Sequence, residues 1–164
     1  MTNKILIIYY SLTGNTKFIA ENIQQAIHAD IQPIKPVKDL NPEGGMKYLW
    51  GGMKATMKSK PKLEKIEIDP NIYDLVFIGT PVWAWTFSPP IRSFLSNYDL
   101  SGKNIALWCC SGGGPGKTLE KLENSLKNSK IVGKIDFVEP LKNNPEEAKQ
   151  QAINWAKNIV NQFN

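Results

Sequence analysis

Six consecutive residues near the start of the chain carry side chains suited to binding a phosphate group. They read Ser11-Leu12-Thr13-Gly14-Asn15-Thr16. Three hydroxyls and one amide can donate hydrogen bonds to an anion, no carboxylate lies among them, and glycine lets the backbone curl with a positive φ. Since residues of these types also cap ordinary helices, a plain capped turn is the alternative. Because four donor side chains exceed what a cap needs, we favour a site for a phosphate monoester.

The segments on either side of this turn predict that it joins a buried strand to a helix. The six apolar residues before it, 5–10, have a length typical of a strand. After it, Ile19, Ile23 and Ile27 recur at helical spacing. The first backbone N–H groups of a helix have no partner within it, and the helix dipole favours an anion there. The turn therefore brings side-chain and backbone donors to one place.

The same six residues resemble the flavin-phosphate loop of the flavodoxin family, whose pattern is Ser/Thr-x-Thr-Gly-Asn-Thr. The match is complete, it follows the first predicted strand as in that family, and the resemblance extends over nearly the whole chain. It implies a noncovalently bound FMN whose phosphate lies in this turn. It also implies the strand order 2-1-3-4-5, of which flavodoxin itself is the usual example, with the ligand between strands 1 and 3.

Alternating strand and helix patterns predict an α/β fold in one flavodoxin-like domain over residues 1–164. Further strands are expected at 31–37, 74–79, 104–110 and 131–138, and further helices at 90–97, 118–127 and 145–163. Pro33 and Pro36 restrict the strand at 31–37 to an edge. This alternation is typical of a doubly wound, five-stranded parallel sheet with helices on both faces.

A second candidate loop follows the predicted strand at 74–79 and is rich in aromatic residues. It includes Pro81, Val82, Trp83, Ala84, Trp85 and Thr86. Connections usually run polar over the surface, whereas a flat ring needs aromatic walls that exclude water. We expect Trp83 and Trp85 to lie on one side of an extended segment and at least one of them to contact a ring. The alternative is that they only cover the sheet, but the resemblance implies that this loop lies along the isoalloxazine ring.

A third candidate loop follows the predicted strand at 104–110 and is rich in glycine. It begins with Ser111, Gly112, Gly113 and Gly114 and continues to Thr118. It is similar to a nucleotide P-loop, but Ser111 stands where that pattern requires glycine, so we do not favour a nucleoside triphosphate. Its place in the chain fits the third flavin-contacting loop of flavodoxins, where backbone N–H groups approach the pyrimidine edge of the ring.

The charge of the chain bears on its partners. The net charge is +5, and residues 46–62 contain five lysines and no acid. Because Arg92 is the single arginine, we expect no nucleic-acid partner. The basic stretch fits an acidic partner protein or a phosphorylated cosubstrate, with a solvated lysine face as the alternative. The overlapping segment 44–60 is interpreted as a flap over the flavin, a docking surface or the second crossover helix. Flavodoxins that carry electrons are usually acidic, so this stretch departs from the family.

The remaining reactive side chains predict neither a metal site nor a catalytic residue. Cys109 and Cys110 are adjacent, which fits a reducing cytoplasm, and we expect one buried and one near-surface thiol rather than a redox pair. His28 is expected at the surface or as a helix cap. We also expect no signal peptide and no membrane span, and a monomer or a small homo-oligomer.

Three functions remain open at this stage. The first, which we favour, is a flavoprotein for electron transport that passes electrons through FMN to a redox partner protein. The second is an oxidoreductase that uses NAD(P)H to reduce FMN or quinones, and the third is a non-redox phosphate-binding or interaction module. Ala84 stands where many flavodoxins have glycine, and no acid lies within 75–95 or 100–119. We therefore predict a less negative potential for the fully reduced flavin than in an acidic flavodoxin.

Overall fold

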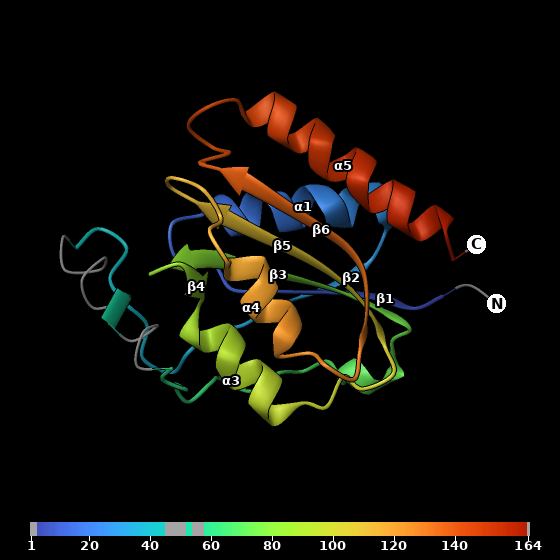
Figure 1. Ribbon diagram of the computed structural model, residues 1–164, viewed down its shortest axis with the longest axis horizontal. Coiled ribbons are helices and arrows are strands. Elements are labelled where there is room, and N and C mark those ends of the chain that lie inside the picture. Colours follow the sequence, from blue (N-terminus) through green and yellow to red (C-terminus); the bar gives the residue numbers. More distant parts are fainter. Residues whose placement is uncertain (1–2, 45–51, 54–57, 164) are drawn as a thin grey trace.

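A computed structural model describes residues 3–44, 52–53 and 58–163. Five parallel strands form a sheet in the order β2-β1-β3-β5-β6 (Figure 1). Their bounds are β1 Ile5–Tyr9, β2 Asp30–Pro33, β3 Leu75–Trp83, β5 Asn104–Ser111 and β6 Lys130–Val138. A short strand, β4 (Thr86–Phe87), pairs antiparallel with the end of β3. The predicted α/β fold is confirmed, since β5 and β6 are the fourth and fifth strands of the expected order.

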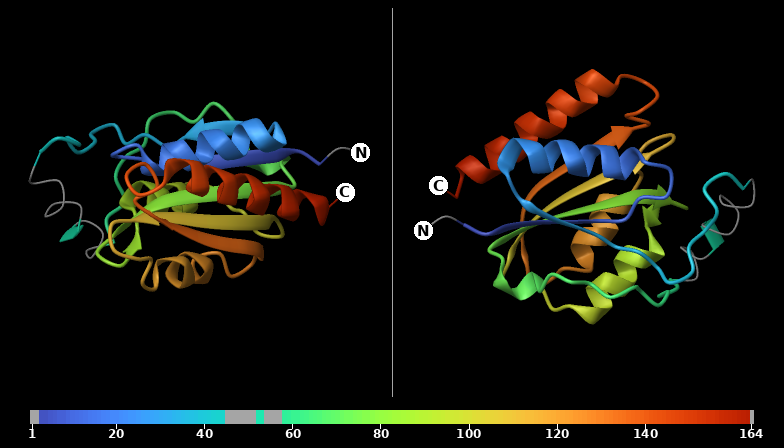
Figure 2. Two further views of the ribbon diagram at one scale, coloured as in Figure 1. Left: turned by 90° about the horizontal axis from the view of Figure 1, so that it is seen from above. Right: turned by 180° about the vertical axis from the view of Figure 1, so that it is seen from behind.

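Helices cover both faces of this sheet. They are α1 Asn15–Ile27, α3 Pro89–Asn97, α4 Thr118–Asn124 and α5 Pro145–Asn161, and a 3₁₀ turn, η1, spans Pro70–Ile72. Helices α1 and α5 lie on one face, and α3 and α4 lie on the other (Figure 2). Helix α5 begins where the Asn144 side chain accepts a hydrogen bond from the Glu147 N–H, with proline in its first turn. Helix α1 ends at His28, which is exposed and caps it, as predicted.

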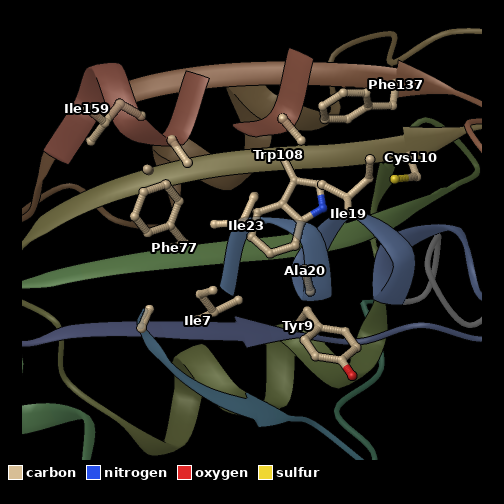
Figure 3. Close-up of a cluster of buried hydrophobic side chains, with 14 of the residues drawn as sticks. Ile7, Tyr9, Ile19, Ala20, Ile23, Phe77, Trp108, Cys110, Phe137 and Ile159 are labelled. Carbon is tan, nitrogen blue, oxygen red and sulfur yellow. The ribbon is translucent and has the colours of Figure 1, made fainter. Parts of the chain in front are cut away.

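Both faces of the central strands are buried, which explains their continuous apolar sequences. In β1, Leu6 and Ile8 face the α3 and α4 side, whereas Ile7 and Tyr9 face the α1 and α5 side. On the latter side Trp108 lies at the centre of the core (Figure 3). A Cβ atom at Gly79 would lie 2.0 Å from the Trp108 ring, so only glycine fits beside this side chain.

The second strand is shorter than the sequence predicts. It pairs only with β1, so the expected edge position is confirmed, but it ends at Pro33 rather than at residue 37. Beyond it the chain bonds to a different segment, because Glu64 N–H donates to Lys35 O and Val37 N–H donates to Lys62 O. Residues 35–37 thus satisfy their backbone groups outside the main sheet.

The aromatic loop differs from the extended segment that we predicted. Strand β3 continues to Trp83 and turns back into β4 through Ala84 and Trp85, which have φ values of 48° and 57°. Two central residues with positive φ are typical of a type I′ hairpin. The expectation that Trp83 and Trp85 lie on one side of an extended segment is therefore wrong. Trp83 is half-buried, whereas the Trp85 side chain is 71% exposed.

The burial of the two cysteines and the lengths of the helices bear on two further expectations. The expected near-surface thiol is not found, because Cys109 and Cys110 are both buried in strand β5. They are free thiols. No helix in the described ranges is long and apolar enough to cross a bilayer.

Candidate functional site

A cavity of about 180 Å³ lies at the carboxyl edge of the parallel sheet, where the loops after β1, β3, β5 and β6 meet. Its lining contains polar, aromatic and aliphatic groups from these four places and from one further segment: Ser11, Leu12, Thr13, Asn15, Thr16, Gly52, Pro81, Val82, Trp83, Ala84, Cys110, Ser111, Gly112 and Glu139. Parallel α/β sheets place their ligands at this edge, next to the point where the winding reverses.

All three loops singled out in the sequence contribute to this lining. The predicted residues that are absent from it are Gly14, Trp85, Thr86, Gly113 and Gly114. Gly14 has a positive φ that shapes the first loop, while Trp85 is the second residue of the hairpin turn and Thr86 begins β4. Because β3 turns back after Trp83, only the residues before Trp85 reach the cavity.

Sequence reasoning missed Gly52, Cys110 and Glu139. Cys110 and Glu139 end or follow strands β5 and β6, so the rule that ligands lie at the carboxyl ends of strands was the available signal. Gly52 belongs to the segment 44–60, whose role the sequence left open. Of that segment the structure describes Gly44, 52–53 and 58–60, so the expected second crossover helix falls mainly outside the described residues.

The first loop presents backbone donors that have no acceptor in the described part of the chain. Helix α1 has no side-chain cap, and the N–H groups of Thr13, Asn15 and Thr16 form no hydrogen bond there. Since the positive end of the helix dipole lies at the same place, these groups form a cradle for an anion. The Thr16 hydroxyl lies in the same lining and is buried.

The shape of this cradle is fixed by contacts from two sides. Ser11 Oγ accepts a hydrogen bond from the Gly14 N–H at 3.2 Å, and Asn15 Oδ1 accepts one from the Leu141 N–H at 3.2 Å. Gly14 has φ 101°, a conformation that favours glycine. The loop after β6 therefore holds the first loop in place.

The aromatic wall of the cavity is Trp83, and a neighbouring tyrosine sets its orientation. The Tyr10 ring meets the Trp83 ring edge to face, with centroids 5.6 Å apart and an interplanar angle of 90°. The Tyr10 hydroxyl donates to Asp39 Oδ1 at 2.6 Å. Burial and then this hydrogen bond raise the Tyr10 pKa, so the tyrosine stays neutral.

The third loop is held by its own serine. Ser111 Oγ accepts a hydrogen bond from the Gly114 N–H at 2.9 Å, and Ser111 O accepts one from the Glu139 N–H at 2.9 Å. A Cβ atom at Gly112 or Gly113 would meet nothing within 4 Å, so open space lies beside both residues. Their backbone is thus accessible to a ligand.

Two titratable side chains line the described part of the cavity. Burial raises the pKa of the Cys110 thiol to about 12, although the Thr16 hydroxyl opposes this effect. The Glu139 carboxylate lies 3.3 Å from Lys142 Nζ. Glu139 belongs to neither of the two acid-free stretches of the sequence, 75–95 and 100–119. Among residues 3–44, 52–53 and 58–163, no three His, Cys, Asp or Glu side chains are placed to hold a metal ion. The site is therefore suited to binding an anion that is joined to a flat, largely apolar group.

Comparisons with known proteins find a flavodoxin and a flavodoxin-like protein among the relatives of this chain. A curated flavodoxin from Clostridium beijerinckii is 27% identical over 160 residues, which cover 94% of this chain and 98% of that protein. The flavodoxin-like domain-containing protein BilS of Clostridioides difficile (strain CD3) is 32% identical over 136 residues. That match covers 79% of this chain but only 62% of the length of BilS.

A solved structure shares the fold of this chain. The crystal structure of a flavoprotein in complex with FMN from Lactobacillus acidophilus NCFM superposes with a TM-score of 0.71. It is 25% identical to this chain, and the match covers 82% of this chain and 93% of that one. The family model described as flavodoxin matches residues 4–159. This chain belongs to the flavodoxin family.

Proposed function

We propose that this protein binds FMN noncovalently and transfers electrons through it to a redox partner protein. The observation that carries the proposal is the helix N-terminus whose free N–H groups face the same cavity as Trp83. The likeness to a flavoprotein that holds FMN supports it.

The residues present fit FMN at each part of the molecule. The N–H groups of Thr13, Asn15 and Thr16, with the nearby hydroxyls, would hold the phosphate. Trp83 would form one wall for the ring, and the accessible backbone of Gly112 would face its polar edge. When bound, FMN supplies a ring that accepts and donates one or two electrons.

The chain's own groups favour a carrier over an enzyme. Of the titratable side chains in the described lining, Cys110 keeps its proton and Glu139 pairs with Lys142. The Cys110 thiol therefore does not act as a base toward a substrate near neutral pH. Trp83 and Leu12 line the site with apolar surface that limits water, and the Tyr10 ring packs against Trp83. The proposal includes a cytoplasmic location, which the two free thiols support, and a monomer or small homo-oligomer.

The test is an anaerobic titration of purified protein loaded with FMN. Tight binding should quench FMN fluorescence, and dithionite but not NADPH should bleach the bound flavin. Bleaching by NADPH within turnover time would instead identify an NAD(P)H-dependent reductase. If FMN does not bind at all, the proposal is wrong and the non-redox module becomes the better interpretation.

A further inference from the structure

Two adjoining cavities of about 290 and 370 Å³ lie between α3 and α4, beyond the hairpin turn that borders the candidate site. Figure 1 shows these two helices side by side below β4. Both cavities share Lys58, Phe87, Arg92 and Ser125 in their linings. Ala84 lines one of them and also the candidate site, so the two sites adjoin across this turn.

The linings of these cavities are cationic. Lys58, Lys60, Arg92 and Lys121 all contribute to them. Within the described ranges none of the four forms an ion pair, and no described Asp or Glu lines either cavity. Lys121 Nζ donates to Trp85 O at 3.0 Å, which ties the cationic group to the hairpin turn and leaves other N–H donors available. The positive charge of this region is therefore not neutralised by neighbouring described side chains.

Among these four cations, Arg92 is held in place by a contact with an aromatic ring. Its guanidinium carbon lies 4.2 Å from the centroid of the Phe87 ring, and Phe87 is almost fully buried. Arg92 Nε is buried and has no hydrogen-bond partner among the described residues. A buried donor without a partner destabilises the fold, and the cost is larger for a charged group. The Arg92 side chain also lines both cavities, and a guanidinium group matches the oxygen geometry of phosphate.

We propose that Arg92, together with Lys58, Lys60 and Lys121, binds a phosphate group at this place, separately from the flavin site. Lys58 and Arg92 line both cavities, Lys60 lines the first and Lys121 lines the second, so each cavity has three cations, which suit a doubly charged anion better than a single carboxylate. The side chains of Ser96, Asn124 and Ser125 offer further donors. The phosphate has two possible sources, a phosphorylated nucleotide cosubstrate and free inorganic phosphate.

The single arginine of the chain provides the probe, because its Nε–H gives one resonance in a nitrogen-15 spectrum. FMN-loaded protein is titrated with inorganic phosphate, adenosine 2′-phosphate, adenosine and acetate at constant ionic strength. FMN blocks the first loop, so a phosphate there does not confuse the result. We expect both phosphates to shift the Arg92 resonance saturably and adenosine and acetate to leave it in place. Tighter binding of the nucleotide than of phosphate would identify the cosubstrate, and equal binding would identify the free anion.

Three variants complete the test by calorimetry. Arg92→Lys keeps the positive charge but removes the planar guanidinium with its paired N–H donors. Lys121→Gln removes one cation and leaves the contact between Arg92 and Phe87 unchanged. Each should weaken phosphate binding about tenfold or more, the loss expected for a charge-assisted hydrogen bond. Lys157→Gln, an equal change of charge on the exposed side of α5, should not. No shift of the arginine resonance, an equal shift by acetate, or an equal loss in Lys157→Gln would overturn the proposal. If the protein does not take up FMN, the Arg92 titration is run without it, so the two proposals fail separately.

Discussion

Replacing Gly14 by alanine tests whether the first loop holds the flavin phosphate. Gly14 has φ 101°, and a Cβ atom there would lie 3.5 Å from Leu141 Cδ1, which is an ordinary contact. The substitution therefore introduces backbone strain without a clash. A left-handed conformation costs a residue with a side chain roughly 1–2 kcal/mol, and the loop relieves that strain by moving the N–H groups of the first helical turn.

Moving one such donor away from a bound phosphate weakens binding by about 1.5–3 kcal/mol, or roughly ten- to hundredfold. The assay is quenching of FMN fluorescence, with riboflavin as the ligand that lacks a phosphate. Gly14→Ala should lose affinity for FMN and keep its affinity for riboflavin.

Gly102→Ala is the matched control. Gly102 has φ 77°, a Cβ there would meet nothing within 4 Å, and the residue lies at the opposite end of β5. Both variants should lose a similar free energy of unfolding, but Gly102→Ala should bind FMN normally. If Gly14→Ala is destabilised like the control and still binds FMN as tightly as the parent protein, the loop is not the phosphate cradle.

Three further predictions follow from the same geometry. Trp83→Ala should weaken FMN binding by about 1–3 kcal/mol through lost stacking and burial. Trp85→Ala should change the affinity for FMN little, because Trp85 is 71% exposed and lies outside the cavity. Equal losses of affinity in the two fluorescence titrations would contradict the assignment of Trp83 as the aromatic wall. Tyr10→Phe removes the hydrogen bond to Asp39 but keeps the ring against Trp83. Urea unfolding should therefore show a loss of about 1 kcal/mol in the free energy of unfolding, and the affinity for FMN should not change. A large loss of affinity would show that the Tyr10 hydroxyl is needed to orient the Trp83 ring. Burial raises the pKa of Cys109 and Cys110 above 9.0, that of Cys110 to about 12, so the unfolded chain loses these protons first as the pH rises. Their contribution to the free energy of unfolding should be fully present below about pH 9 and should fall above it by about 1.4 kcal/mol per pH unit for each thiol. Urea unfolding at two pH values checks this, and the fall should be shallower in Cys110→Ala. Equal free energies of unfolding at both pH values would contradict the prediction.

Local signals explain why the first loop and its flanking elements are predictable from the sequence. These segments are adjacent in the chain, and the residue pattern of each one predicts its structure without distant contacts. They are the apolar strand at Ile5–Tyr9, the polar turn after it and the helix with apolar spacing at Asn15–Ile27. The same holds for α5, whose asparagine cap and proline mark its start at residue 145.

The hairpin at Ala84 and Trp85 is not predictable in this way. Neither residue favours the positive φ that a type I′ turn requires, and such turns usually contain asparagine, aspartate or glycine. Distant contacts hold it instead, since Thr80 Oγ1 accepts the Ser88 N–H at 2.9 Å and Lys121 donates to Trp85 O. Glu139 is a similar case, because only the assembled sheet brings its loop beside Ser111.

The pairing of α1 with α5 has a consequence for how the protein is made. The face of the sheet that carries Phe77 and Trp108 is covered by helices that begin at residues 15 and 145 (Figure 3). At a synthesis rate of roughly 5–20 residues per second, a nascent chain exposes this apolar face for on the order of ten seconds before α5 leaves the ribosome. During that interval chaperones and neighbouring nascent chains compete for it. Helix α5 adds the contact of Trp155 with Phe77, whose ring centroids lie 5.5 Å apart, so burial of the Trp155 ring marks the stage at which this face of the sheet is covered.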